Sequence, residues 1–155
     1  MLEAFPSPAE LTGAVQGTLL YLGLYICFIV FQSFSKFYLL SQKQQEAKAK
    51  GGARVSLRAL KYYNSKDMLA LTGDRTVGNY LEFSIVFLPC MWLHALFVDP
   101  SQSLLLCTMY TACRLPYPFI YLYGSHPLYI LVSTIPCYLI KIYLVWMLVV
   151  RVVVN

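Results

Sequence analysis

The sequence predicts an all-α membrane protein, built as an antiparallel bundle of four transmembrane helices. Hydrophobic residues make up 59% of the 155 residues and charged residues only 12%, with a mean hydropathy of +0.61. Soluble domains carry about 25% charged residues, so this composition excludes an ordinary soluble fold. The sequence also lacks the alternating polar and apolar pattern that a transmembrane β-barrel requires.

Four apolar stretches are long enough to cross roughly 30 Å of hydrocarbon as helices. They run over residues 11–40, 76–98, 103–123 and 128–150, and together they form a single domain over residues 1–155. The first stretch is longer than a span requires, which predicts a tilted helix or a helical extension into water. Turn-forming residues at 99–101 and 124–127 separate the last three spans, which are therefore expected to be antiparallel neighbours.

Basic residues are concentrated in the connection between the first two spans, residues 41–75. This basic loop contains eight Lys and Arg residues, whereas the segments expected on the opposite face contain only Arg151. The asymmetry predicts that the loop faces the cytoplasm or its equivalent and that both termini lie on the other side. The net charge of +5 therefore reflects topology and attraction to anionic lipid, and it does not require nucleic acid. We expect a multi-pass protein of the endoplasmic reticulum or another organelle membrane.

Two polar triplets lie within the predicted spans, one in the second span and one in the third. They are Arg75, Asn79 and Glu82, and then Arg114, Tyr117 and Tyr121. Their spacing places each triplet on one face of a helix. An ionisable residue in a bilayer is costly unless it faces a bundle interior, a cavity or a charged partner. Counted from the basic side, Glu82 lies roughly 10 Å and Arg114 roughly 14 Å inside the membrane. We therefore predict a polar pocket with Glu82 and Arg114 within direct or one-water reach, inside a subunit or across an interface.

A pocket of this composition suits a small zwitterionic peptide. Arginine binds carboxylates, glutamate binds an ammonium group, and asparagine and tyrosine satisfy amides. Apolar helix faces around the pocket admit a lipophilic ligand from the bilayer. Simpler interpretations stay open: Glu82 and Arg114 form an ion pair that fixes helix register, Arg75 anchors a helix end, and the two tyrosines pack at the membrane interface. Lys141, nearer the other face, is interpreted as a snorkelling side chain or a subunit contact.

The two triplets resemble those of the MAPEG family, the membrane-associated proteins of eicosanoid and glutathione metabolism. The resemblance rests on the spacing of the six residues from Arg75 to Tyr121, on the four spans and on the polar loop after the first span. It implies a homotrimer that binds glutathione between neighbouring subunits as a co-substrate. It also implies that residues matching Arg75, Asn79 and Glu82 contact the polar ends of the tripeptide. Tyr117 and Tyr121 match tyrosines that hydrogen-bond the tripeptide from the neighbouring subunit.

The chain departs from the family where reactive members place an arginine that stabilises the glutathione thiolate. Leu128 and Ile130 occupy the expected positions, and no Arg or Lys occurs between Tyr121 and Lys141. His126 is the only candidate base in this segment. Cysteine and histidine spacing indicates no metal site. Two functions therefore stay open: a glutathione-binding protein, with or without transferase or peroxidase activity on lipophilic substrates, and a non-catalytic protein that presents lipid or serves as an accessory subunit of a larger membrane complex.

Overall fold

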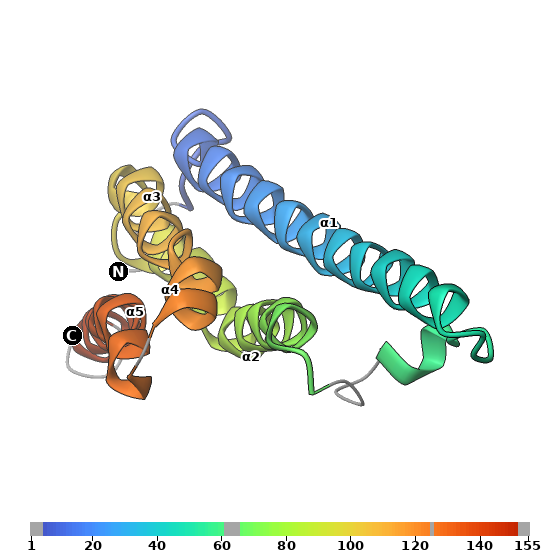
Figure 1. Ribbon diagram of the computed structural model, residues 1–155. Coiled ribbons are helices and arrows are strands. Elements are labelled where there is room, and N and C mark those ends of the chain that lie inside the picture. The colour runs from blue at the N-terminus through green and yellow to red at the C-terminus, as the bar shows by residue number, and fades with distance from the viewer. Residues whose placement is uncertain (1–4, 61–65, 125, 152–155) are drawn as a thin grey trace.

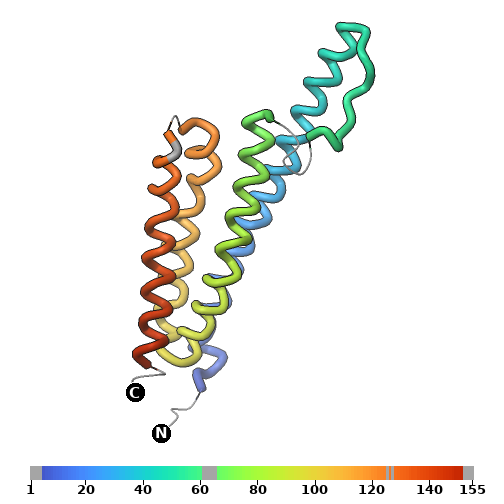
Figure 2. The backbone as a smooth tube through the Cα atoms, turned by 90° about the horizontal axis from the view of Figure 1, so that it is seen from below, coloured from blue at the N-terminus to red at the C-terminus, as the bar shows by residue number. Residues whose placement is uncertain are grey.

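The protein folds as an all-α membrane bundle, as the sequence predicts. The computed structural model describes residues 5–60, 66–124 and 126–151. Within these residues, three helices are long and apolar enough to cross a membrane: α1 (Thr12–Ala49), α2 (Met68–Phe97) and α5 (Ile130–Val149). The third predicted span is formed by two shorter helices that follow each other along one line, α3 (Ser103–Arg114) and α4 (Tyr117–Tyr123) (Figure 2).

The break between α3 and α4 falls at Pro116, inside the span predicted over residues 103–123. Proline has no N–H group to donate to the preceding turn, and its ring clashes with the carbonyl of that turn. The helix resumes at once, since the Ile120 N–H donates to the Pro116 carbonyl at 3.0 Å. The span therefore keeps its predicted limits but is divided into two helices.

The helices pack in an order that places α1 and α5 on different sides of the bundle. α1 packs against α2 and α3, and α5 packs against the same two helices (Figure 1). The start of α1 and the end of α5 lie at one end of the bundle, while the connection between α1 and α2 lies at the other (Figure 2). This arrangement matches the predicted antiparallel order of the spans.

The connection between α1 and α2 is shorter than the predicted basic loop of residues 41–75. α1 continues to Ala49 because residues 41–49 are mainly Gln, Glu, Lys and Ala, which favour helix in water as well as in lipid. α2 begins at Met68, where the Asp67 carboxylate caps the helix by accepting from the Leu69 N–H at 3.0 Å. The connection holds a short 3-10 helix, η1 (Leu57–Leu60), and two similar turns, η2 (Pro100–Gln102) and η3 (Pro127–Tyr129), precede α3 and α5.

Aromatic side chains join α1, α2 and α3 at the centre of the bundle. The rings of Phe87 and Tyr110 stack with centroids 3.8 Å apart, and those of Tyr21 and Tyr80 stack at 4.5 Å. The Tyr21 hydroxyl donates to the Tyr80 carbonyl at 3.2 Å, and the Tyr80 hydroxyl donates to the Tyr21 carbonyl at 2.8 Å. These reciprocal bonds satisfy two phenols in a membrane interior, where an unpaired polar group is costly.

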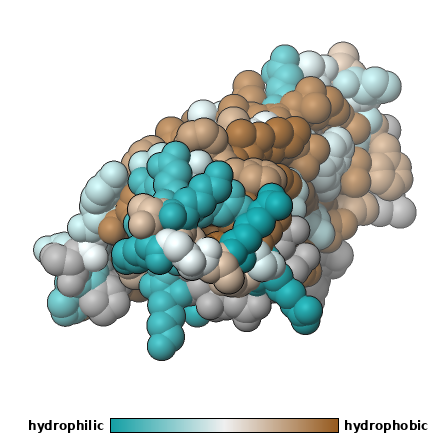
Figure 3. All heavy atoms as spheres, turned by 45° about the vertical axis from the view of Figure 1, so that its right-hand side comes forward, coloured by the Kyte–Doolittle hydropathy of each residue, from teal (hydrophilic) through white to brown (hydrophobic). Residues whose placement is uncertain are grey.

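One face of the molecule separates into an apolar region and a polar end. Figure 3 shows hydrophilic side chains gathered at the end formed by the last turns of α1 and the loop that follows, with hydrophobic side chains over the bundle beyond it. This distribution is the one expected of a protein whose bundle lies in lipid and whose α1 extension lies in water.

Candidate functional site

The triplet on α2 is divided between the outside and the inside of the bundle. Arg75 and Glu82 are exposed, whereas Asn79 is half-buried. Glu82 lies at the middle of the 30-residue helix and has no hydrogen-bond or ion-pair partner among the described residues. Its neighbours Leu81 and Ile85 are 43% and 75% exposed, so the carboxylate lies on an otherwise apolar outer surface.

Arg114 lies inside the bundle, at the end of α3. Only 1% of its surface is exposed. Its Nη1 donates to Asn79 Oδ1 at 2.7 Å, and its guanidinium lies 3.8 Å from the centroid of the Phe83 ring. Asn79 and Phe83 are four residues apart on α2, so they present one face to Arg114. The arginine is therefore held by an amide and an aromatic ring.

Arg114 and Glu82 form no ion pair within the chain, so the simpler hypothesis of an ion pair that fixes helix register is wrong for a single subunit. Glu82 precedes Phe83 by one residue, and successive residues point about 100° apart around a helix. Phe83 is 8% exposed and packs inward, so Glu82 faces outward.

The two tyrosines of the second triplet lie next to each other on α4. Tyr117 is 5% exposed and Tyr121 is half-buried, and their ring centroids are 6.2 Å apart. The Tyr117 ring centroid lies 6.0 Å from the Arg114 guanidinium carbon. The structure therefore brings Arg114, Asn79, Tyr117 and Tyr121 together, while Arg75 and Glu82 lie on the adjacent outer face of α2.

A buried ion pair between α1 and α2, one residue before Arg75, was not anticipated from the sequence. The Lys36 ammonium on α1 donates to Asp74 Oδ1 on α2, and Gln32 Nε2 donates to the same oxygen at 2.7 Å. Residue 74 belongs to the predicted basic loop of residues 41–75, where a carboxylate in contact with water needs no partner. The available signal was the lysine in the last part of an apolar span, which requires a nearby anion.

Lys141 on α5 does not extend to the surface as the snorkelling interpretation required. It is 9% exposed, and its Nζ lies 3.6 Å from the Phe83 ring centroid and 4.2 Å from that of Tyr138. Phe83 therefore contacts two cations, Arg114 and Lys141. An aromatic face attracts a cation most strongly when both are shielded from water.

The segment where reactive MAPEG members place an arginine is apolar in the structure as well. Leu128 lies in η3 and is 60% exposed, and Ile130 is the first residue of α5. The exposed His126 ring accepts a hydrogen bond at Nδ1 from the Leu128 N–H at 3.3 Å. A leucine side chain offers no charge to a bound thiolate.

Comparison with protein-family models gives one match over nearly the whole length of the chain. The model of the MAPEG family matches residues 18–153. Comparisons with curated proteins and with solved structures give no match. The family match includes all of α2, α3, α4 and α5, and thus both polar triplets. The chain therefore belongs to the MAPEG family, and it is an integral membrane protein of the family associated with glutathione and eicosanoid metabolism.

Proposed function

We propose that the protein binds glutathione on the outer face of α2, at Arg75, Asn79 and Glu82. The observation that carries this proposal is the exposed carboxylate of Glu82 in the middle of an apolar span, with no hydrogen-bond or ion-pair partner in the part of the chain that the structure describes. An ionised carboxylate that faced lipid would cost several kcal/mol, and a cationic group that lay against it would remove this cost. The ammonium group of glutathione is such a partner.

The contacts of Asn79 support a binding role for the amide. Its Oδ1 accepts from Arg114, so its NH₂ group is left to donate to a carbonyl or carboxylate of the tripeptide. Arg114 is buried and already holds the amide, so we assign it the role of a positioning residue. Arg75, exposed two turns before Glu82, is placed to meet a glutathione carboxylate.

A second copy of the chain completes the proposed site. The outer face of α2 is open in a single chain, and a homotrimer, as the family resemblance implies, would cover it. Tyr121 is half-buried on α4 and supplies a hydroxyl at the edge of the same region. In this proposal each glutathione lies between α2 of one subunit and α4 of its neighbour, and a lipophilic molecule enters from the bilayer.

Activation of the glutathione thiol is less well supported than binding. Lowering the pKa of a thiol requires a nearby positive charge, and Leu128 supplies none at the position where reactive members carry arginine. The exposed leucine favours a second candidate function, in which the protein presents a lipid or serves as an accessory subunit without conjugating glutathione. We therefore expect slow transferase turnover.

Titration of the purified protein with glutathione tests the proposal. Glu82→Gln removes the charge opposite the ligand ammonium and should weaken binding roughly ten- to a hundredfold, the effect of losing about 1.5–3 kcal/mol. Glu46→Gln makes the same change on the exposed extension of α1 and should leave the affinity within about twofold. Equal losses in both variants, or no binding by the folded protein at millimolar glutathione, would contradict the proposed site.

A further inference from the structure

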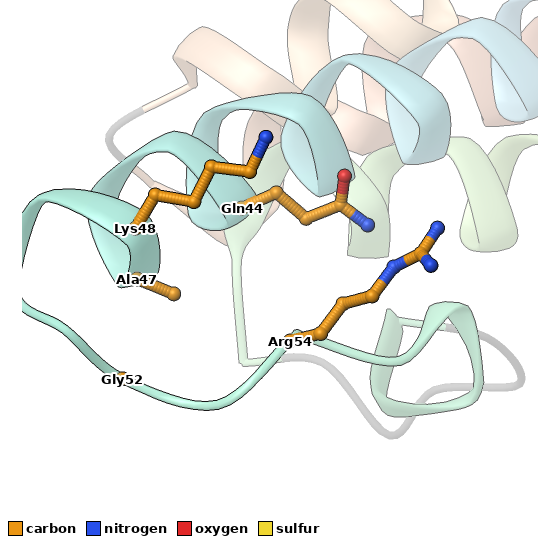
Figure 4. Close-up of a pocket in the computed structure, with 5 residues that line it drawn as sticks. All are labelled: Gln44, Ala47, Lys48, Gly52 and Arg54. Carbon is orange, nitrogen blue, oxygen red and sulfur yellow. The ribbon is translucent and has the colours of Figure 1, made fainter.

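The end of α1 and the loop that follows it line a partly open basic cavity outside the bundle. The cavity has a volume of about 390 Å³ and is lined by Gln44, Ala47, Lys48, Gly52 and Arg54. Figure 4 shows Gln44, Ala47 and Lys48 on α1, with Gly52 and Arg54 on the loop that faces them. It lies well away from the polar triplets, which belong to α2, α3 and α4.

The loop is fixed against α1 by backbone contacts. Gly51 has a φ of +63°, a conformation that favours glycine, and it reverses the chain directly after the helix. The Gly52 N–H then donates to the Ala47 carbonyl at 2.8 Å. Further along, Gln44 Nε2 donates to the Val55 carbonyl at 3.5 Å. The two walls of the cavity are therefore tied to each other at both ends.

A small hydrophobic cluster anchors the far end of the loop. Leu60 is 1% exposed and packs with Leu39 of α1 and Ala70 of α2. This contact joins the loop to both helices at the point where they leave the apolar region. The cavity is thus part of a folded unit.

The cavity carries two positive charges, those of Lys48 and Arg54, that no described residue neutralises. Lys48 and Arg54 have no hydrogen-bond or ion-pair partner among the described residues. The cavity lies at the C-terminus of α1, which offers an anion no backbone N–H donors and carries a partial negative charge that disfavours it. Any anion bound here depends on the ammonium, the guanidinium and the Gln44 amide, three groups that together suit a phosphate.

The position of the cavity along α1 indicates the source of the phosphate. Leu40 ends the apolar stretch, and Gln44 and Lys48 lie four and eight residues further on, or about 6–12 Å at 1.5 Å per residue. A bilayer headgroup layer extends about 5–8 Å beyond the hydrocarbon core. The cavity therefore lies at the outer edge of the headgroup layer. A second phosphate on the headgroup, farther from the hydrocarbon than the phosphate attached to glycerol, can reach this depth.

We propose that this cavity binds the phosphomonoester of an anionic lipid headgroup in the leaflet on the basic-loop side. Lys48 and Arg54 contact the phosphate oxygens, and Gln44 donates a further hydrogen bond. General attraction of the basic loop to anionic lipid would be spread over all of its cations. Binding in the cavity instead depends on two of these cations, Lys48 and Arg54.

The test uses the full-length protein in uncharged detergent micelles, titrated with short-chain phosphatidylinositol 4-phosphate and followed by native mass spectrometry. The double variant Lys48→Gln/Arg54→Gln should lose at least tenfold in affinity. Lys50→Gln/Lys66→Gln removes two charges from the same connection outside the cavity and should lose less than threefold. Equal losses in the two variants would overturn the proposal, because they would show that the charges act collectively.

Two comparisons with the unmodified protein need no variant and hold even if a variant fails to fold. Short-chain phosphatidylinositol lacks the phosphomonoester and should bind at least tenfold more weakly than phosphatidylinositol 4-phosphate. Equal affinity for both lipids would contradict recognition of the phosphate. Free inositol phosphate should also bind at least tenfold more weakly, and equal affinity would show that the cavity takes a soluble phosphorylated ligand and not a lipid.

Discussion

Charged residues are accommodated inside this protein by different means at different positions. Lys36 meets a carboxylate, that of Asp74, whereas Lys141 lies against the Phe83 ring. Arg114 combines both types of partner, an amide oxygen and the same ring. Glu82 has no hydrogen-bond or ion-pair partner among the described residues. It is this difference that singles out Glu82 as a group awaiting a partner from outside the chain.

Removal of one member of the Lys36–Asp74 pair should be strongly destabilising. Asp74→Ala leaves the buried ammonium without its anion, which should lower the free energy of unfolding by about 3–5 kcal/mol. Denaturant titration in mixed micelles measures this change. Replacing both residues, with Lys36→Met and Asp74→Leu, removes the uncompensated charge and should cost much less. A double variant as unstable as Asp74→Ala would show that the pair does not account for the effect.

A gain of function at Leu128 tests the role assigned to the missing arginine. Leu128→Arg places a cation at the position used by reactive family members, and the 60% exposure of Leu128 leaves space for the longer side chain. A thiol of pKa about 8.5 is only slightly ionised at pH 7, so lowering its pKa by about one unit raises the thiolate fraction about eightfold. Conjugation of a model electrophile at pH 7 should rise by about that factor.

The uncharged variant Leu128→Gln is the control for polarity without charge, and its turnover should stay at the level of the unmodified protein. If Leu128→Arg binds glutathione but conjugates it no faster, the thiol of the bound tripeptide does not lie near residue 128.

At the scale of the elements, the contact of α1 with α3 depends on a glycine. A Cβ built on Gly17 would lie 2.6 Å from the Cβ and 2.8 Å from the Sγ of Cys107, so the two helices meet almost backbone to backbone. Gly17→Ala should force the helices apart and lower stability by about 1–3 kcal/mol. Gly23 on the same helix has no atom within 4 Å of such a Cβ. Gly23→Ala should be neutral or stabilising by up to about 1 kcal/mol, since alanine favours helix. Unfolding titration of both variants gives the comparison, and equal changes would contradict the close contact.

Hydrophobic length was sufficient to predict which elements exist, but not all of their limits. The four spans could be located because each apolar stretch approaches or exceeds the length that lipid demands. The limits of the basic connection could not, because residues 41–49 form helix in water and hydropathy does not register such a helix. Asp67 was the available sign that α2 begins at Met68, since aspartate commonly caps a helix.

At the scale of the whole molecule, helical spacing predicted which polar residues share a region of the bundle but could not assign their partners. The pattern of Arg75, Asn79 and Glu82 correctly placed three polar groups on α2. Whether Arg114 would meet Glu82 or Asn79 depends on the rotation of α2 about its axis, which is set by packing of residues such as Phe83 and Phe87. Packing of this kind cannot be deduced from spacing alone, and the same holds for the contact of Lys141 with Phe83.

We propose that copies of this chain assemble around glutathione, with Glu82 facing the ligand. Native mass spectrometry of the purified protein in micelles with millimolar glutathione tests it most directly, because it counts subunits and bound ligands together. We predict a trimer carrying up to three glutathione molecules, and for Glu82→Gln a trimer that has lost most of its glutathione. A monomer, or a folded trimer without bound glutathione at this concentration, would contradict the claim.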